Sequence, residues 1–417
     1  MVGDGALAGL LLGAAALGCG GAEGEPALAE APSAASPVPL GSRSEQAATT
    51  AAAAVVAAPT SRPRRLIRGS ARSGAIGPQG STGLPSDPVS VPALPEAPRY
   101  RLIDGPSPLQ PLPRLSAALG GRAELWIKRE DLLPLGFGGN KLRNLEFLVG
   151  AALAEDADTL VTAGRRWSNH CRLTAAAGAR AGLQVHVVLS GPPVEGSPGP
   201  RLDRLLGATV HQAATVDRAE RAALVAEVMA RLRAEGRRPY EIGLGGSGAV
   251  GALGQVAAAF ELGEQADSRR LNPDELILPS ATGGTQAGLL VGLRAHGRPT
   301  VVRGFTVAHP ATELRPTIEA LVDELAPRFG TAVAASEVEL DDGQLGGGYG
   351  RPSSAARAAT RLLARTEGLF VDPIYTAKAL AGLCERVRAG GLDDRSVVFW
   401  HAGGLPGLFE PGLEGEG

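Results

Sequence analysis

From Arg99 onward, the apolar residues of the chain alternate between two patterns. Eight short runs rich in β-branched residues indicate buried strands: ELWIK, TLVTAG, VHVVLSG, YEIGLGG, ELILPS, TVVRGFTV, LFVDPI and SVVFWHAGG. Between several of them lie Ala- and Leu-rich segments of helical length, such as DRAERAALVAEVMARLRAEG. Strands that alternate with helices predict an α/β fold with a mostly parallel sheet covered on both faces. Ligands of such folds bind at the carboxyl ends of the strands.

The N-terminal part shows neither pattern. Residues 22–95 are mainly Ala, Pro, Ser and Gly, and we expect a disordered arm because they lack apolar surface to offset the ordering entropy. Residues 1–21 contain the apolar run ALAGLLLGAAALGC, which is short for a membrane span and ends at Cys19 as a lipoprotein leader would. Asp4 and the lack of Lys or Arg in the first six residues argue against an export signal. We favour a cytoplasmic protein and keep an exported lipoprotein anchored through Cys19 as the alternative.

Charge and cysteine content limit the classes of ligand that the protein is expected to bind. The 417 residues carry a formal net charge of −2, so no overall field favours nucleic acid or an anionic membrane. Cys19, Cys171 and Cys384 lack metal-ligand spacing, and the sequence supports neither a disulfide framework nor a structural zinc site. We therefore expect a small-molecule partner.

Lysine is unusually rare. Of 41 basic residues only Lys128, Lys141 and Lys378 are lysines, so arginine supplies positive charge almost everywhere. A primary amine can lose its proton and form an imine with an aldehyde, whereas guanidinium stays protonated. Lys141 directly follows the segment GFGGN and begins the amphipathic segment LRNLEFLVGAAL, where backbone can approach a ligand closely. An ordinary lysine in the first turn of a surface helix is the alternative.

A second segment indicates a phosphate site. ILPSATGGTQAGLLVGL, from Ile277 to Leu293, predicts a buried strand, a Gly/Thr/Ser loop and a helix beginning near Thr285. The segment contains neither GxGxxG nor GxxxxGK[ST], so neither a dinucleotide nor ATP is favoured. An anion site combined with one special lysine suggests pyridoxal phosphate. Taken alone, the loop could equally be a plain connection.

Residues from about Tyr100 to Phe409 resemble the family of D-cysteine desulfhydrases and 1-aminocyclopropane-1-carboxylate (ACC) deaminases, which have the tryptophan-synthase-β-like fold of pyridoxal phosphate enzymes. The matching blocks, in order, are SPLQPLPRLS, WIKREDLLPLGFGGNKLRNLEFL, TLVTAGRRWSNHCR, RPYEIGLGGSGAVGALG, TGGTQAGL, GGGYGRP, EGLFVDPIYTAKALAGL and HAGGLPGLF. The resemblance implies two open, mostly parallel sheets flanked by helices within residues 96–417. It further implies a smaller α/β subdomain at about 140–255, inserted in a larger one, and a homodimer.

The resemblance also assigns cofactor contacts. Lys141 corresponds to the lysine that forms the Schiff base with pyridoxal phosphate. Asn140 and Asn169 would lie beside the cofactor ring, with Asn169 hydrogen-bonded to the phenolic oxygen, and Thr376 would face the pyridine nitrogen. The phosphate would be held by Ala281, Thr282, Gly283, Gly284 and Thr285.

Further roles concern the substrate. Ser168, which begins the SNH turn, would help to receive the substrate carboxylate, and Tyr349 and Tyr375 correspond to the family's two active-site tyrosines. The alternative for Tyr375 is a core aromatic residue at a helix end. His170 is more simply explained as a structural histidine than as an acid.

Five positions depart from the family pattern. Trp167 stands in place of a glutamine and Arg166 in place of an apolar residue, which alters the mouth of the substrate site. Asn144 replaces a lysine that can reach the phosphate. Gly343 stands where an aromatic residue is frequent, and Ala402 replaces a threonine near the ring nitrogen.

The implied reaction is β-elimination from D-cysteine or a related D-amino acid, which gives pyruvate, ammonia and sulfide. Lys141 would take the Cα proton, and the cofactor would serve as the electron sink. ACC has no Cα proton, and its deaminases pair a glutamate at the ring nitrogen with a leucine in the later HxGG block, where this chain has Thr376 and Ala402. ACC deamination remains the alternative, together with a non-catalytic or exported ligand-binding relative, although Lys141 argues against a non-catalytic protein.

Overall fold

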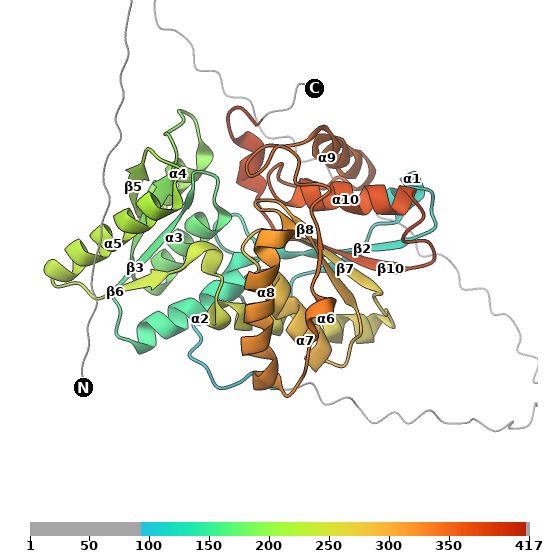
Figure 1. Cartoon of the computed structure of the whole chain (residues 1–417), viewed down its shortest axis with the longest axis horizontal. Helices are drawn as coiled ribbons and strands as arrows, with labels where there is room; N and C mark the ends of the chain where they lie inside the picture. Colours follow the sequence, from blue (N-terminus) through green and yellow to red (C-terminus); the bar gives the residue numbers. More distant parts are fainter. Residues whose placement is uncertain (1–92, 414–417) are drawn as a thin grey trace, which may run out of the picture. The chain divides into compact units, whose positions relative to one another are not determined.

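The computed structural model describes residues 93–413, which form two separate sheets flanked by helices (Figure 1). This confirms the predicted fold class. The predictions for residues 1–21, and for nearly all of 22–95, concern a part of the chain outside the described residues.

The larger sheet has six strands in the order β1-β2-β10-β7-β8-β9. Strand β1 pairs antiparallel with β2, and every other pair is parallel. The strands are β1 (Leu109–Pro111), β2 (Glu124–Arg129), β7 (Glu275–Ser280), β8 (Val301–Thr306), β9 (Glu339–Asp341) and β10 (Ser396–His401).

The smaller sheet is parallel throughout, with its four strands in the order β5-β4-β3-β6. Its strands are β3 (Thr159–Arg165), β4 (Gln184–Ser190), β5 (Thr209–Ala213) and β6 (Pro239–Ile242). All four lie consecutively in the chain, between two segments that build the larger sheet.

Ten α-helices and five short 3₁₀-helices complete the described region. The α-helices are α1 (Pro113–Ala118), α2 (Lys141–Ala154), α3 (Asn169–Ala181), α4 (Pro198–Leu205), α5 (Arg218–Ala234), α6 (Ala249–Arg269), α7 (Gly284–Ala295), α8 (Ala311–Leu325), α9 (Ser354–Glu367) and α10 (Thr376–Arg388). The 3₁₀-helices are η1 (Glu130–Leu132), η2 (Leu244–Gly246), η3 (Ala326–Phe329), η4 (Ala335–Glu337) and η5 (Leu405–Phe409). Across residues 93–413, no helix is both long and apolar enough to cross a membrane.

Both faces of each sheet are buried, as expected for parallel strands. In β7, Leu276 and Leu278 join a core with α6, α7 and α8, whereas Ile277 between them joins a second core with α9 and α10. In β3, Leu160 packs with α2 and α3, and Val161 packs on the opposite face with α5. Successive side chains of a strand point to opposite faces, so the near-continuous apolar runs of the sequence reflect this double coverage.

Seven of the eight runs predicted as strands contain one. The prediction is wrong for LFVDPI, at residues 369–374, where the chain forms a turn that leads into α10. Val371 and Ile374 are buried there, but the carboxylate of Asp372 accepts hydrogen bonds from the amides of Ile374, Tyr375 and Thr376. Such side-chain capping bends the backbone toward a helix start instead of a sheet ladder.

Candidate active site

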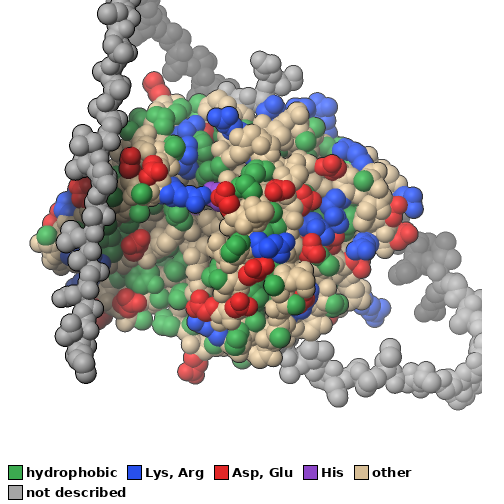
Figure 2. All heavy atoms as spheres, in the orientation of Figure 1, with side chains coloured by type: hydrophobic (Ala, Val, Ile, Leu, Met, Phe, Trp, Pro, Cys, Tyr) green, Lys and Arg blue, Asp and Glu red, His purple; other side chains and the backbone are tan. Residues whose placement is uncertain are grey.

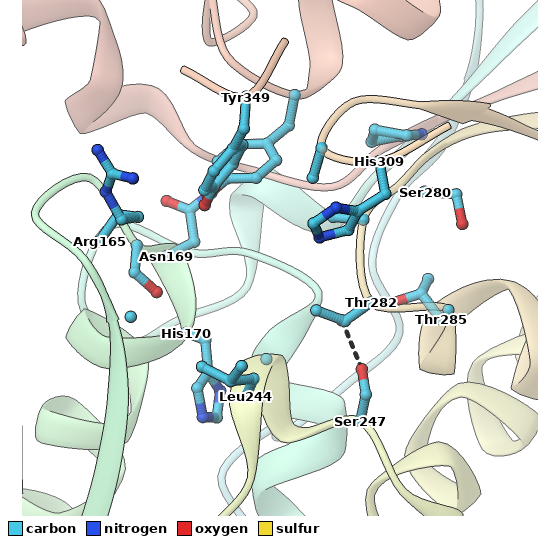
Figure 3. Close-up of a pocket in the computed structure, with 18 of the residues that line it drawn as sticks. Arg165, Asn169, His170, Leu244, Ser247, Ser280, Thr282, Thr285, His309 and Tyr349 are labelled. Atoms are coloured by element: carbon cyan, nitrogen blue, oxygen red, sulfur yellow. Dashed lines mark hydrogen bonds between the residues drawn. The ribbon is translucent and has the colours of Figure 1, made fainter. Parts of the chain in front are cut away.

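A cavity of about 670 Å³ opens where β3 and β7 end (Figure 3). Its walls come from the start of α2, the β3–α3 and β7–α7 loops, and the segments that carry Tyr349 and Tyr375. The volume lies within the range of about 300–1,000 Å³ typical of small-molecule sites. Ten predicted site residues line it: Asn140, Lys141, Ser168, Asn169, Ala281, Thr282, Gly283, Thr285, Tyr349 and Tyr375.

Lys141 is the first residue of α2 and presents its side chain to the cavity. Burial lowers its pKa to about 8. The positive end of the helix dipole disfavours the ammonium form as well, and no carboxylate of the described residues forms an ion pair with Lys141. A substantial fraction of the amine is therefore neutral, and hence nucleophilic, near physiological pH.

The turn before Lys141 requires glycine. Gly138 has φ +68°, and a Cβ there would lie 1.9 Å from the carbonyl oxygen of Asp131. Gly139 has φ +130°, and its Cα would lie 2.6 Å from a Cβ on Gly403. Since the backbone of the later HAGG segment packs directly on this turn, two distant parts of the sequence fix the position of Lys141.

The loop after β7, predicted to be an anion site, leads into a helix N-terminus. Helix α7 begins at Gly284, and no side chain caps its N-terminus, which leaves amides available to a ligand. Thr282 Oγ1 lies 2.5 Å from Ser247 Oγ (Figure 3). Thr285 Oγ1 accepts a hydrogen bond of 3.0 Å from Asn140 Nδ2. These contacts tie the anion loop to α2 and to the segment after β6.

Asn169 and Ser168 lie at the start of α3. Arg172 Nη2 donates a hydrogen bond of 2.9 Å to Asn169 Oδ1, which leaves the amide nitrogen of Asn169 as a donor toward the cavity. Ser168 is the N-cap of α3, and its Oγ accepts from the amide of Cys171 at 3.2 Å. The cap occupies one amide, and the positive end of the α3 dipole still favours a carboxylate at its remaining amides.

Tyr349 and Tyr375 form a pair at the cavity wall, with their hydroxyl oxygens 2.5 Å apart. Burial raises the pKa of Tyr349 and raises that of Tyr375 well above its usual value. Both phenols therefore keep their protons at neutral pH. Lys378 holds the loop that carries Tyr349, because its Nζ donates to the carbonyl oxygens of Leu345 at 2.7 Å and Gly348 at 2.8 Å.

Two predicted site residues are not among those that line the cavity. Gly284 is the first residue of α7, packed against Ser247. The hydroxyl of Thr376 is turned to Asp372, whose amide donates to it at 3.0 Å and whose carboxylate it contacts. The contact of Thr376 with a ring nitrogen stays a prediction. Asp372 itself was missed, although an aspartate just before a helix is a recognisable capping signal.

The structure places the departures from the family pattern in different environments. Ala402 lines the cavity, whereas Asn144 is buried beside it, donates to the carbonyl of Gly246 at 3.0 Å and accepts from Gln255 Nε2 at 2.5 Å. Gly343 lies outside the cavity and donates its amide to Asp341. An effect of Gly343 on the site would therefore have to be indirect.

Arg166 and Trp167 also lie outside the cavity lining. Arg166 Nε forms an ion pair of 2.5 Å with Glu410, and the indole of Trp167 is buried with its ring edge-on to Tyr349 at 5.7 Å between centroids. Their effect on the mouth of the substrate site therefore stays a prediction. Such an effect would pass through Tyr349 and through Arg165, which does line the cavity.

His170 lines the cavity but carries no charge at neutral pH. Burial, aided by Lys141, lowers its pKa to about 3. Its Nε2 lies 3.0 Å from Thr162 Oγ1. This supports a structural histidine.

Comparison with known proteins agrees with this geometry. Residues 100–403 match the family model described as pyridoxal-phosphate dependent enzyme. The D-cysteine desulfhydrase of Klebsiella pneumoniae (strain 342) is 40% identical over 77% of this chain and 98% of its own length. That of Salmonella newport (strain SL254) is 41% identical over 75% of this chain and 95% of its own.

A solved structure described as an ACC deaminase homologue shares the fold. It superposes with a TM-score of 0.70 at 34% identity and covers 76% of this chain and 94% of its own. The family match spans both sheets and every residue of the anion loop. The chain belongs to the family of pyridoxal-phosphate-dependent enzymes.

Proposed function

We propose that this protein catalyses β-elimination of D-cysteine, or of a related β-substituted D-amino acid, to pyruvate, ammonia and sulfide. The observation that carries the proposal is the amine of Lys141, its pKa lowered to about 8, in one cavity with an uncapped helix N-terminus. The two desulfhydrase relatives, aligned over nearly their whole length, support the choice of substrate.

The cavity residues fit pyridoxal phosphate. The amides and hydroxyls from Thr282 to Thr285 would hold its phosphate, the amide nitrogen of Asn169 would donate to its phenolic oxygen, and Lys141 would carry it. When bound, the cofactor withdraws electrons from the Cα atom of an amino acid. The side chains around it then decide which bond is broken.

Side chains of the protein bind the substrate and transfer the protons. Ser168 and the N-terminus of α3 bind the substrate carboxylate, and the amine of Lys141 takes the Cα proton. The Cβ–S bond breaks with its electron pair on sulfur, which takes a proton from the Tyr349–Tyr375 pair. Water then converts the unsaturated amino acid product to pyruvate and ammonia, so the overall reaction involves no net oxidation.

ACC deamination is the second candidate, because the solved ACC deaminase homologue shares the fold at 34% identity. Incubation with D-cysteine, L-cysteine, β-chloro-D-alanine and ACC, with 2-oxo acid release followed over time, separates the two. We expect pyruvate from the D-substrates. Rapid 2-oxobutyrate from ACC without pyruvate from the D-substrates would refute the proposal.

We further propose a cytoplasmic homodimer in which residues of about 140–255 form a smaller subdomain. The resemblance to the family supports the dimer, and the consecutive strands β3 to β6 support the subdomain. Light scattering after size-exclusion chromatography tests the dimer. Mass analysis of the mature N-terminus tests the location, since a lipid on Cys19 would indicate the exported alternative.

A further inference from the structure

Three arginines line the cavity on the side of the smaller sheet: Arg165 at the end of β3, and Arg218 and Arg221 in the first turn of α5. Within residues 93–413, none of them forms an ion pair with a carboxylate. Glu313 supplies a carboxylate to the wall, but its oxygen lies 3.6 Å from His309. This side of the cavity therefore has an excess of positive charge.

The proposed reaction leaves that charge unexplained. The cofactor phosphate is assigned to the uncapped start of α7, and the substrate carboxylate to Ser168 at the start of α3. A D-cysteine side chain is mostly neutral below the thiol pKa of about 8.5. Arg218 is exposed and donates to His309 Nδ1 at 2.9 Å, and Arg221 donates to Ser190 Oγ at 3.4 Å. A partly buried guanidinium without a partner among the described residues is costly, so Arg165 in particular points to an anion that binds there.

Arg165 is the best defined of the three. Its Nε is buried and has no hydrogen-bond partner among the described residues. Its guanidinium carbon lies 4.9 Å from the ring centre of Trp167, and a Cβ on Gly191 would lie 3.4 Å from its Nη2. The group is thus held between an indole and a glycine backbone, on the side of the cavity that holds Asn169 and Tyr349 (Figure 3).

The adjacent arginine provides an internal contrast. Arg166 stacks on the same indole at 4.4 Å, but its charge is neutralised by Glu410. Trp167 therefore packs against two guanidinium groups: that of Arg166, which is paired with Glu410, and that of Arg165, a residue that lines the cavity. Since Trp167 also contacts Tyr349 edge-on, it places Arg165 beside the residues assigned to the departing group.

We propose that Arg165, assisted by Arg218 and Arg221, binds an oxyanion on the β-substituent of the substrate, so that the preferred substrate is a D-amino acid with a β-sulfonate or β-phosphate ester. The inference rests on the proposed β-elimination and extends it to substrates whose leaving group is sulfite or phosphate in place of the sulfide of D-cysteine. Lys141 takes the Cα proton, and the Cβ–S or Cβ–O bond breaks with its electron pair on the departing sulfite or phosphate. Water then gives pyruvate and ammonia, and nothing is oxidised or reduced.

The first test compares kcat/KM for D-cysteate and O-phospho-D-serine with kcat/KM for β-chloro-D-alanine, which has a similar length and no anionic side chain. We expect the anionic substrates to be preferred by the wild-type holoenzyme. The ratio of anionic to neutral kcat/KM should fall by about 10- to 100-fold in Arg165→Met, the loss expected for a charge-assisted hydrogen bond. The two anionic substrates distinguish a sulfonate from a phosphate ester.

Matched variants distinguish anion binding by Arg165 from a general effect of removing positive charge. Arg233→Met removes an exposed arginine from the same helix as Arg221, and the ratio should stay at the wild-type value. Arg165→Lys keeps a cation without the planar fork and should recover part of the ratio. If Arg165→Met fails to fold, Arg221→Met provides the same comparison with a smaller expected fall.

A binding measurement makes the anion site testable without turnover. Methanesulfonate should raise the Tm of the wild-type holoenzyme, neutral dimethyl sulfone should not, and the rise should disappear in Arg165→Met. Pyruvate from β-chloro-D-alanine with no preference for the anionic substrates would overturn this inference and leave the proposed function intact. If no substrate is turned over, the proposed function fails, and an equal methanesulfonate shift in wild type and Arg165→Met would then overturn the anion site as well.

Discussion

The three lysines differ in what their ammonium groups contact. Lys128 Nζ donates to Glu261 at 2.5 Å, to Gln265 at 2.7 Å and to the carbonyl of Ser107 at 2.7 Å, so its three donors are used. Lys378 donates to two carbonyls, whereas the amine of Lys141 has no hydrogen-bond or ion-pair partner among residues 93–413 and lines the cavity. Lys128 and Lys378 are therefore engaged in structural contacts, and the amine of Lys141 is left available.

This difference predicts the site of cofactor attachment. Borohydride reduction of the holoenzyme followed by peptide mass analysis should place the adduct on Lys141. Lys141→Arg should abolish turnover, because a guanidinium cannot form the imine, and it should keep part of the cofactor affinity through the anion loop. An adduct on Lys128 or Lys378 would contradict the assignment.

The lowered pKa of Lys141 also predicts a pH-dependent stability of the apoprotein. The folded pKa of about 8 lies below the ordinary value of 10.5, so the unfolded chain binds the proton more tightly and charging this group destabilises the fold below both values. Lys141→Met should be more stable than wild type at pH 7, by about 1–3 kcal/mol. The advantage should shrink as pH rises from about 8 to 10.5. Urea unfolding at pH 7 and pH 10 measures it, and an equal difference at both pH values would contradict the prediction.

At the level of elements, the start of α7 combines backbone amides with two threonine hydroxyls. Thr285→Ala removes the acceptor of Asn140 Nδ2 and a hydroxyl that faces the cavity. We expect cofactor affinity to fall by about 1–3 kcal/mol, as for a lost hydrogen bond to a charged group. Absorbance titration of the apoenzyme with pyridoxal phosphate measures this, and an unchanged Kd would place the phosphate elsewhere.

Substitution of Gly283 in the same loop should lower cofactor affinity more strongly, and for a different reason. It has φ +82°, and an added Cβ would lie 2.8 Å from Cγ1 of Ile318. In Gly283→Ala, the new methyl group would therefore clash with a side chain of α8, and the backbone conformation would be unfavourable for alanine. Both effects would displace the loop in addition to any contact with the ligand. Cofactor affinity should fall further than in Thr285→Ala, and Ile318→Ala in the same chain should restore part of it, because alanine lacks the Cγ1 atom that the added Cβ would meet.

The loop that carries Tyr349 is held in place by Lys378 of α10. Lys378→Met removes the donor to the carbonyls of Leu345 and Gly348 while keeping the length of the side chain. As a positioning residue, Lys378 should affect kcat more than KM, by about 10-fold, because the Tyr349–Tyr375 pair is misplaced. A fall in thermal stability without a change in kcat would indicate a structural role only.

The elements that could be predicted from sequence are those with strong local signals. β7 and β10 contain continuous apolar runs because both of their faces are buried, and α5 has the length and composition of a helix. Strands β1 and β9 have three residues each, too few for any periodicity. LFVDPI has apolar residues for packing, and its turn depends on the contacts of Asp372.

The residues of the site likewise differ in whether a local sequence signal marks them. Lys141 and the anion loop have local glycine signals, and the resemblance to the family supplied Tyr349 and Tyr375. Arg165, Arg218 and Arg221 were missed, because arginine is abundant in this chain and only the packing of α5 beside the end of β3 brings them to one wall. No local pattern distinguishes an arginine with a partner, such as Arg166, from one without.

At the scale of the whole molecule, the two sheets, their helices and the cavity all lie within residues 93–413, and the family match covers 100–403. The desulfhydrase relatives have 95–98% of their own length aligned to only 75–77% of this chain, so the catalytic unit needs no contribution from the low-complexity segment. Removal of residues 1–92 should therefore leave the cofactor absorbance and the Tm unchanged, and kcat/KM for β-chloro-D-alanine within about two-fold of the full chain, because residues 93–413 contain both sheets and the cavity. Removal of residues 1–112 is the matched comparison, since it deletes β1 and buried Leu109, Leu112 and Leu102, and it should abolish folding or cofactor retention. Loss of cofactor after the shorter deletion would assign the N-terminal segment a part in the enzyme itself.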